Sequence, residues 1–168
     1  MGMRDVRIGK IVVNIGVGEA GEKLAKAQKV LQMVARQKPV QTLAKDSVRD
    51  WAVRKNMPIG TKVTLRGERA QDFLRRALAV RSNRLPEYVF DARGNFSFGI
   101  TDYTDFEGMK YDPEIGVFGM DVSVSLVRPG YRVQIRRVAP GRIPRGHRVS
   151  KGEALEFAKQ AFGLEVVE

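Results

Sequence analysis

Two segments in the first half of the chain alternate between hydrophobic and polar residues. Between residues 10 and 17, the apolar residues Ile11, Val13 and Ile15 are separated by single positions, and between residues 59 and 66 Val63 and Leu65 are spaced in the same way. Side chains point to opposite faces of a β-strand in turn, so this spacing predicts two strands, each with one buried face. The polar residues that fall on the opposite faces are Lys10, Asn14, Lys62, Thr64 and Arg66.

Other segments repeat their apolar residues at helical spacing. Leu24, Ala27, Leu31, Val34 and Ala35 predict a helix that ends before Pro39, and a short strand is expected at residues 40–43. Residues 68–80 predict a second helix. Ser150 and Glu153 form the pattern of a capping box, which predicts that a C-terminal helix begins at this point.

The remaining elements complete the predicted fold. Residues 95–98 and 122–126 alternate as strands do, and after a Pro129–Gly130 turn Val133 and Ile135 alternate with Arg132, Gln134 and Arg136. We therefore expect a single α+β domain over residues 1–168, with a largely antiparallel, twisted sheet and helices packed on one face. A long hairpin loop is expected to protrude at about residues 44–58.

Charge is distributed in blocks along the sequence. The chain carries a formal charge of +11, yet residues 1–86 hold 19 basic and 7 acidic side chains, residues 87–127 hold 2 and 8, and residues 128–151 hold 8 and none. Strong patches of one sign attract partners of the opposite charge. Two basic blocks beside an acidic one therefore predict a surface for nucleic acid and a second surface that faces elsewhere. A thermostable surface rich in ion pairs is the alternative interpretation.

Composition excludes several classes of protein. There is no cysteine, which excludes a disulfide scaffold and any thiolate metal site or nucleophile. The longest uninterrupted apolar run is Ala77–Val80, far shorter than a membrane span. The first residues lack the apolar stretch of a secretory signal, so we expect a soluble intracellular protein without membrane contact.

A glycine motif raises the question of nucleotide binding. Gly16, Gly18 and Gly21 match the G-x-G-x-x-G pattern between a strand and a helix. However, Glu19 places an acid inside the supposed phosphate loop, and no parallel βαβ units follow. The only histidine, His147, lies between arginines, and no nucleophile elbow or metal-ligand spacing is present. We expect no catalysis, no metal, no cofactor and no small-molecule substrate.

The loop at residues 44–58 holds the only tryptophan, Trp51. Long loops in compact domains are often functional, and Arg49, Arg54, Lys55 and Asn56 can reach a phosphate backbone. Trp51 is equally compatible with a core anchor and with a stacking group. If the predicted strands are neighbours, their polar faces combine into one surface rich in hydrogen-bond donors, which is suited to a folded nucleic-acid backbone.

Several motifs together resemble the large-subunit ribosomal protein L5 family, known as L11 in eukaryotes. They are VVNIGVGEA (12–20), QKPVQTLAKDS (37–47), PIGTKVTLRGE (58–68), GNFSFGI (94–100) and GMDVSVSL (119–126). RPGYR (128–132) and HRVSKGEA (147–154) are similar to the archaeal and eukaryotic branch. The resemblance extends over nearly the whole chain and implies a ribosome-bound, cytoplasmic protein of the central protuberance that binds 5S rRNA.

The resemblance also implies roles for individual residues. Asn14, Gln37, Trp51 and Thr64 match the family's 5S rRNA surface, to which alternation adds Lys10, Lys62 and Arg66. The loop that matches residues 47–56 is the family's contact to the P-site tRNA, with Ser47, Arg49, Arg54, Lys55 and Asn56 as candidates, although Asp46 and Asp50 depart from the neutral or basic residues of relatives. The expected phosphate contacts to rRNA are Arg132, Arg136, Arg137, Arg142, Arg145 and Arg148.

The acidic block has a candidate use in this context. Family members touch the large rRNA and the small-subunit protein S13, with which they form an intersubunit bridge. Because like charge repels RNA, we expect Asp102, Asp105 and Glu107 to face a basic ribosomal neighbour. The rival classes are a small nucleotide-binding enzyme that uses the glycine turn and a regulatory module that binds proteins through its acidic face.

Overall fold

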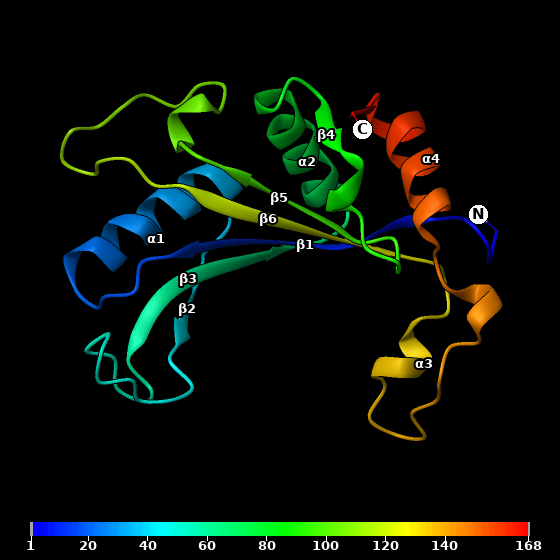
Figure 1. Ribbon diagram of the computed structural model, residues 1–168, viewed down its shortest axis with the longest axis horizontal. Helices are drawn as coiled ribbons and strands as arrows, with labels where there is room; N and C mark the ends of the chain where they lie inside the picture. The colour runs from blue at the N-terminus through cyan, green and yellow to red at the C-terminus, as the bar shows by residue number, and fades with distance from the viewer. Residues whose placement is uncertain (1, 168) are drawn as a thin grey trace. The chain divides into compact units, whose positions relative to one another are not determined.

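The computed structural model describes residues 2–167, in which strands and helices alternate irregularly (Figure 1). The strands are β1 (Arg7–Gly16), β2 (Val40–Leu43), β3 (Pro58–Leu65), β4 (Arg84–Pro86), β5 (Phe96–Ile100), β6 (Met120–Val127) and β7 (Glu165–Val167). The helices are α1 (Glu22–Ala35), α2 (Glu68–Val80), α3 (Arg132–Ile135) and α4 (Lys151–Phe162). Short 3-10 turns lie at Glu87–Val89, Tyr103–Asp105 and Arg145–His147.

Five of the strands form one sheet in the order β2-β3-β1-β6-β5. β2 and β3 run antiparallel, with Val40 opposite Lys62 and Thr42 opposite Gly60. The α+β class, the antiparallel sheet and the C-terminal helix that the sequence predicted are confirmed. Contacts divide the chain into two compact units, of which unit 2 contains Val12–Leu65 and Gly99–Val122, and unit 1 contains the residues up to Ile11, Arg66–Phe98 and the residues from Ser123 onward. The expected single domain over residues 1–168 stays a prediction.

Unit 2 packs α1 against one face of β3, and the alternation of each strand sets which residues meet the helix. Val13, Ile15, Val63 and Leu65 are buried, as are Leu24, Ala27, Leu31, Val34 and Ala35 of the helix. Gly60 shows how closely these strands approach, because a Cβ at this position would lie 2.7 Å from Thr42 Oγ1 and 3.0 Å from the carbonyl oxygen of Ile15. The predicted periodicity of both strands and of the helix is therefore correct.

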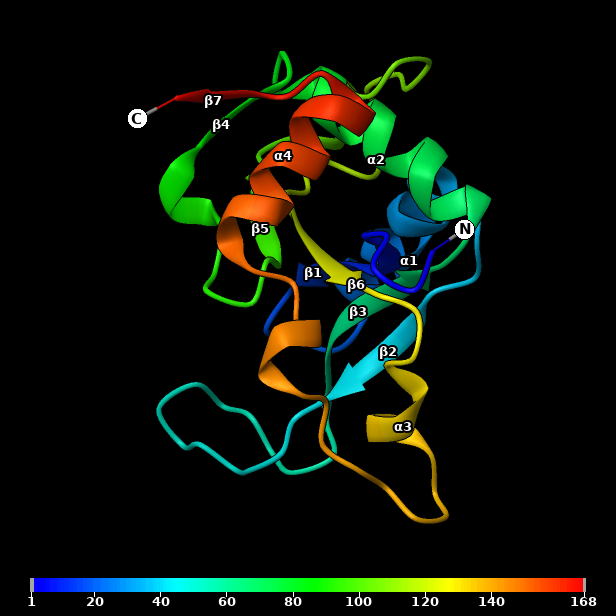
Figure 2. The same ribbon diagram turned by 90° about the vertical axis from the view of Figure 1, so that its right-hand side faces the viewer.

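In unit 1, α2 and α4 lie on the same side of the strands that this unit contributes to the five-stranded sheet (Figures 1 and 2). α2 buries the predicted stripe Ala70, Phe73, Leu74, Ala77 and Leu78. The capping box predicted for α4 is present, since Ser150 Oγ accepts from the backbone N–H of Glu153 and Glu153 Oε2 accepts from the backbone N–H of Ser150. β4 and β7 form a separate parallel pair.

The predicted strand-like face at residues 132–136 is wrong, because Arg132–Ile135 form the one-turn helix α3. Backbone hydrogen bonds run from Val133 N to the carbonyl oxygen of Gly130 and from Arg136 N to that of Arg132. Ile135 is 82 % exposed, so its apolar side chain does not mark a buried strand face. Two apolar residues in alternation fit a strand and a helical turn equally well, and the Pro129–Gly130 turn decides for the helix.

Candidate RNA-binding surfaces

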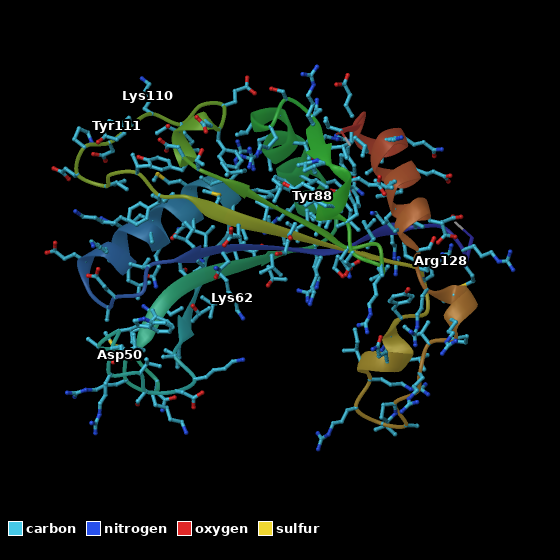
Figure 3. All side chains as sticks on the ribbon, in the orientation of Figure 1. Asp50, Lys62, Tyr88, Lys110, Tyr111 and Arg128 are labelled. Atoms are coloured by element: carbon cyan, nitrogen blue, oxygen red, sulfur yellow. The ribbon has the colours of Figure 1, made fainter. Side chains whose placement is uncertain are left out.

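The first candidate surface lies in unit 2 and consists of Asn14 on β1 and Lys62 and Thr64 on β3; we call it the β1/β3 polar face. Each of these residues alternates with buried neighbours, so its side chain points away from α1. Lys62 is exposed, and Asn14 and Thr64 are half-buried. Figure 3 shows Lys62 on the side of β3 that faces away from α1. The surface therefore presents an amide, a hydroxyl and an ammonium group on paired strands.

Gln37, the fourth expected contact residue in unit 2 besides the loop, supports this face from the inside. Its side-chain Nε2 donates to the carbonyl oxygen of Thr64 at 3.2 Å, and the residue is half-buried. The hydrogen bond fixes the end of β3 to the segment that follows α1. Gln37 thus has a positioning contact within the protein, which the sequence alone did not show.

The loop between β2 and β3 is a structured hairpin rather than an open coil. Val48 and Val53 exchange both backbone hydrogen bonds of an antiparallel bridge, at 2.9 and 3.1 Å. Ser47 Oγ accepts from the backbone N–H of Lys55 at 2.8 Å, so this side chain holds the hairpin together. The loop extends beyond β2 and β3 on the side of those strands away from α1 (Figures 1 and 2).

Trp51 stands at the end of this hairpin with 76 % of its surface exposed. The interpretation of Trp51 as a core anchor is therefore wrong, because nothing in the hairpin covers the ring. Arg49, Arg54, Lys55 and Asn56 are exposed as well. Asn56 adopts a left-handed backbone conformation with φ of 67°, and its N–H donates to the carbonyl oxygen of Ala44, which closes the base of the hairpin.

The second candidate surface lies in unit 1, where a cavity of about 660 Å³ gathers arginine and lysine side chains from distant parts of the sequence. We call it the basic concavity. Its charged lining residues are Lys10, Arg66, Arg93, Arg132, Arg142 and Arg148. The other residues around it are Gly9, Asn95, Ser125, Leu126, Val127, Tyr131, Gln134, Ile135 and Ile143. Lys10 and Arg66, expected at the 5S rRNA surface, thus line a cavity with three of the expected phosphate contacts.

Polar contacts fix the segment that carries these arginines. The hydroxyl of Tyr131 accepts from the backbone N–H of Val149 at 3.1 Å, and Nε2 of His147 lies 2.8 Å from the carbonyl oxygen of Pro129. Arg128, only 7 % exposed, donates to Glu153 and to the carbonyl oxygen of Gly146. The segment is therefore held together at several points, and Arg128 ties it to α4 through Glu153, although it contains little regular structure.

Glu153 connects this network to the N-terminus of α4. The hydrogen bond from the backbone N–H of Ser150, together with the bond from the Arg128 guanidinium, holds the pKa of the Glu153 carboxyl below its usual value. A second carboxyl of unit 1, Glu87, has its pKa lowered by a hydrogen bond and ion pair with Lys151. Both carboxylates therefore bind residues of the chain itself and hold the N-terminal end of α4 in place.

The other expected phosphate contacts lie outside the lining of the basic concavity. Arg136 donates from Nε to the carbonyl oxygen of Ala139 at 2.7 Å, which closes the turn after α3. Arg137 is exposed on the same turn, and Arg145 is exposed in the 3-10 turn before α4. The structure therefore brings together Arg132, Arg142 and Arg148 but not the complete set.

The glycine motif forms a tight turn in which backbone N–H groups already donate hydrogen bonds within the protein. The backbone N–H groups of Val17 and Gly18 donate to the carbonyl oxygen of Ile59 at 3.0 and 2.8 Å. Gly18 and Gly21 have φ of 80° and 115°, conformations that other residues rarely adopt. A phosphate loop needs free amides at this place, so the geometry favours the strand-to-helix turn over nucleotide binding.

The acidic segment divides between internal and exposed carboxylates. Asp102 Oδ1 accepts from the backbone N–H of Thr104 at 2.9 Å and caps the following 3-10 turn. Asp105 and Glu107 are exposed in unit 2. Among the described residues no cluster of His, Cys, Asp and Glu is suited to a metal ion, and no described helix has the length and apolarity to cross a membrane.

The sequence did not point to Arg93, Asn95 or Tyr131 as parts of a site. Arg93 and Asn95 lie in the acidic block, whose net charge does not indicate contact with nucleic acid. The GNFSFGI motif indicates the family but does not indicate a role for the side chain of Asn95. Only the arrangement of β1, β6 and the segment after β6 in unit 1 brings these residues to the cavity.

Comparison with known proteins gives the family. A family model described as ribosomal protein L5 matches residues 2–54, and the model of the C-terminus of the same ribosomal family matches residues 58–157. The large ribosomal subunit protein uL5 of Thermoplasma volcanium is 54 % identical over 166 residues, which cover 98 % of each chain. The uL5 protein of Sulfurisphaera tokodaii is 53 % identical over 167 residues, 99 % of this chain and 94 % of the relative. That of Methanoregula boonei is 47 % identical over 164 residues, 98 % and 99 % of the two chains. The chain therefore belongs to the ribosomal protein uL5 family, a family of structural, non-enzymatic proteins of the large ribosomal subunit.

Proposed function

We propose that the protein binds 5S rRNA through the β1/β3 polar face and helps to attach this RNA to the large subunit as part of the central protuberance. The bound RNA is folded beforehand, and the protein recognises its shape and its backbone. Asn14 and Thr64 offer hydrogen bonds to sugar and phosphate oxygens, and Lys62 offers a positive charge. Few aromatic residues lie on this face, so stacking of successive bases is not part of the mechanism.

The observation that carries this proposal is the orientation of the polar side chains in unit 2. The apolar side chains of β1 and β3 are buried on the face that α1 covers. No helix of the unit covers the opposite face (Figure 1). Because strands are held by backbone hydrogen bonds, the backbone fixes the direction in which each side chain leaves this face before RNA arrives. A backbone that is ordered in advance loses little conformational entropy on binding.

The test is the affinity of the full chain for a 5S rRNA transcript, measured by filter binding. Lys62→Ala and Thr64→Ala should each weaken binding by about 1 kcal/mol, because each removes one hydrogen-bonding group. Binding of the unaltered chain should also weaken steeply with salt, since each phosphate contact releases counterions. Lys110→Ala is the matched control, because it removes the same charge from an exposed position of unit 2 outside this face (Figure 3). Equal effects of the Lys62 and Lys110 substitutions, or a flat salt dependence, contradict the proposal.

The hairpin between β2 and β3 is proposed to contact the P-site tRNA. Its exposed Arg49 and Arg54 provide two charges for phosphates. Arg49→Ala combined with Arg54→Ala should leave 5S rRNA affinity intact and weaken tRNA binding to the P site of reconstituted ribosomes. Substitution is preferable to deletion, because the backbone groups of residues 54–56 close the hairpin. Loss of 5S rRNA binding in this variant argues against a separate tRNA contact.

The exposed carboxylates of the acidic segment are proposed to meet a basic ribosomal neighbour, the small-subunit protein S13, in an intersubunit bridge. Asp105 and Glu107 are the residues to reverse, because Asp102 is needed as a cap. Asp105→Lys with Glu107→Lys should weaken subunit association in sedimentation experiments and leave 5S rRNA affinity unchanged. An unchanged association constant counts against this contact.

A further inference from the structure

We propose that the basic concavity of unit 1 holds a single unstacked nucleotide of the bound RNA, with the base against its apolar wall and the flanking phosphates on its arginines. This inference rests on the proposed function, since it takes RNA as the partner. It adds a second kind of recognition, because a strand face reads the outside of a folded RNA whereas a cavity selects a nucleotide that has left the stack.

The charge of the cavity favours an anion of more than one negative group. Six cationic side chains line it, and no carboxylate is among its lining residues. None of the six takes part in a salt bridge in the described part of the chain. Asp91, two residues before Arg93, already accepts hydrogen bonds from the backbone N–H groups of Arg93 and Asn95 and from Asn95 Nδ2. The cavity therefore carries a positive charge without a carboxylate among its lining residues, which attracts anionic ligands.

The cavity also has an apolar wall, which a simple phosphate site does not need. Tyr131, Ile135 and Ile143 line it together with two apolar residues of β6. Tyr131 is fixed at its hydroxyl by the backbone of Val149, so its ring is held in place. Ile135 is 82 % exposed, so its apolar side chain is accessible to a ligand. A base has a planar apolar surface of the right kind to cover these side chains.

Size and hydrogen-bonding groups agree with one nucleotide. The volume of about 660 Å³ lies within the range of small-ligand cavities and is too small for an RNA helix. Gln134 is exposed on α3 and offers both a donor and an acceptor to the edge of a base. Gly9 keeps β1 close to β6, because a Cβ there would lie 2.7 Å from Val127 Cγ1. Gly9 therefore leaves room for the side chain of Val127 at the wall of the cavity.

The first experiment titrates the full chain with adenosine 5′-monophosphate and with inorganic phosphate and follows backbone amide resonances. Adenosine monophosphate should shift the resonances of Gly9, Val127 and Tyr131 and bind at least about fivefold more tightly than phosphate, which corresponds to a weak base-stacking contribution. Equal affinity of the two ligands, or shifts confined to other parts of the chain, overturns the proposal.

Two substitutions separate the charge from the base contact. Arg142→Ala should weaken both ligands by about tenfold, because it removes a charged hydrogen bond. Gln134→Ala should weaken adenosine monophosphate about threefold and leave phosphate binding unchanged. Arg75→Ala is the matched control, since Arg75 is an exposed arginine of α2 in the same unit that does not line the cavity. An Arg75→Ala effect as large as that of Arg142→Ala indicates general attraction of anions and overturns the site.

A second experiment distinguishes failure of this site from failure of the proposed function. A hairpin RNA with one bulged nucleotide should compete for the full chain at least about fivefold better than the same hairpin without the bulge, and Arg142→Ala should abolish that preference. If the two hairpins compete equally while Lys62→Ala still weakens 5S rRNA binding, the nucleotide site is wrong and the proposed function stands. If Lys62→Ala has no effect while the bulge preference persists, the proposed function is at fault.

Discussion

The β1/β3 polar face and the basic concavity use similar side chains on very different backbones. Asn14, Lys62 and Thr64 stand on paired strands whose other side is packed on α1. The arginines around α3 stand on a segment with a single helical turn, which is held by contacts such as those of Tyr131 and Arg128. The β1/β3 polar face obtains its rigidity from the hydrophobic core, whereas the segment around α3 obtains it from a few polar hydrogen bonds. We therefore expect the two regions to respond differently to the same kind of change.

The largest difference is expected when a methyl group is added to a glycine in each region. Gly60→Ala places a Cβ 3.0 Å from the backbone oxygen of Ile15 and 2.7 Å from Thr42 Oγ1. It should lower the free energy of unfolding by about 2 kcal/mol, as overpacking does. A Cβ at Gly146 has no neighbouring atom within 4 Å, so Gly146→Ala should change the free energy of unfolding by less than about 0.5 kcal/mol. Urea unfolding of both variants makes the comparison, and equal effects contradict the assigned difference in packing.

Lowering the pH should destabilise the segment around α3 before it destabilises the β1/β3 polar face. The pKa of Glu153 is lowered in the folded chain, so its carboxylate stabilises the fold above its unfolded pKa, near 4.3, and this contribution is lost as the pH falls through the folded pKa. Glu153→Gln should cost about 1.5 kcal/mol at pH 7, because Arg128 is left buried without its anionic partner.

Measurement of unfolding against pH tests this directly. The difference between the original chain and Glu153→Gln should be constant above about pH 5 and shrink towards zero in more acidic solution. Amide exchange should increase first around residues 145–153 and not in β3. A difference that is independent of pH down to the acid transition argues against the ion pair as the anchor.

A smaller effect is expected from the internal support of the strand face. Gln37→Ala removes the hydrogen bond to the carbonyl oxygen of Thr64 and should destabilise the chain by about 1 kcal/mol. Gln37→Glu places a carboxylate oxygen against the carbonyl oxygen of Thr64, so it should destabilise the chain at least as much as Gln37→Ala. If 5S rRNA affinity falls much further than stability does, Gln37 contacts the RNA in addition to its positioning role.

The smallest effect on stability is expected at the tip of the hairpin. Trp51 is 76 % exposed, so Trp51→Ala should change the free energy of unfolding by less than about 0.5 kcal/mol. Its fluorescence should have the maximum of a solvent-exposed indole and should shift when 5S rRNA is added to the isolated chain. A loss of several kcal/mol in the variant shows that the ring is buried in solution.

The comparison also explains what the sequence could predict. Alternation identified Asn14, Lys62 and Thr64 because burial on one face of a strand imposes a period of two on the sequence. The same reasoning failed at Arg132 and Gln134, where no core imposes a period and a turn decides the conformation. The contributions of Arg93 and Asn95 to the basic concavity depend on which strands become neighbours. The periodicity of a single sequence does not predict this pairing. The hydrogen bond of Gln37 joins residues 27 positions apart and left no local pattern.

The most direct measurement of the central claim is photo-crosslinking from single positions of the chain to 5S rRNA. Benzoylphenylalanine in place of Lys62 stands on the β1/β3 polar face, and the same group in place of Lys110 stands elsewhere on unit 2 (Figure 3). The account predicts a crosslink to 5S rRNA from position 62 and none above background from position 110. Absence of a crosslink from position 62, or equal yields from the two positions, would contradict it.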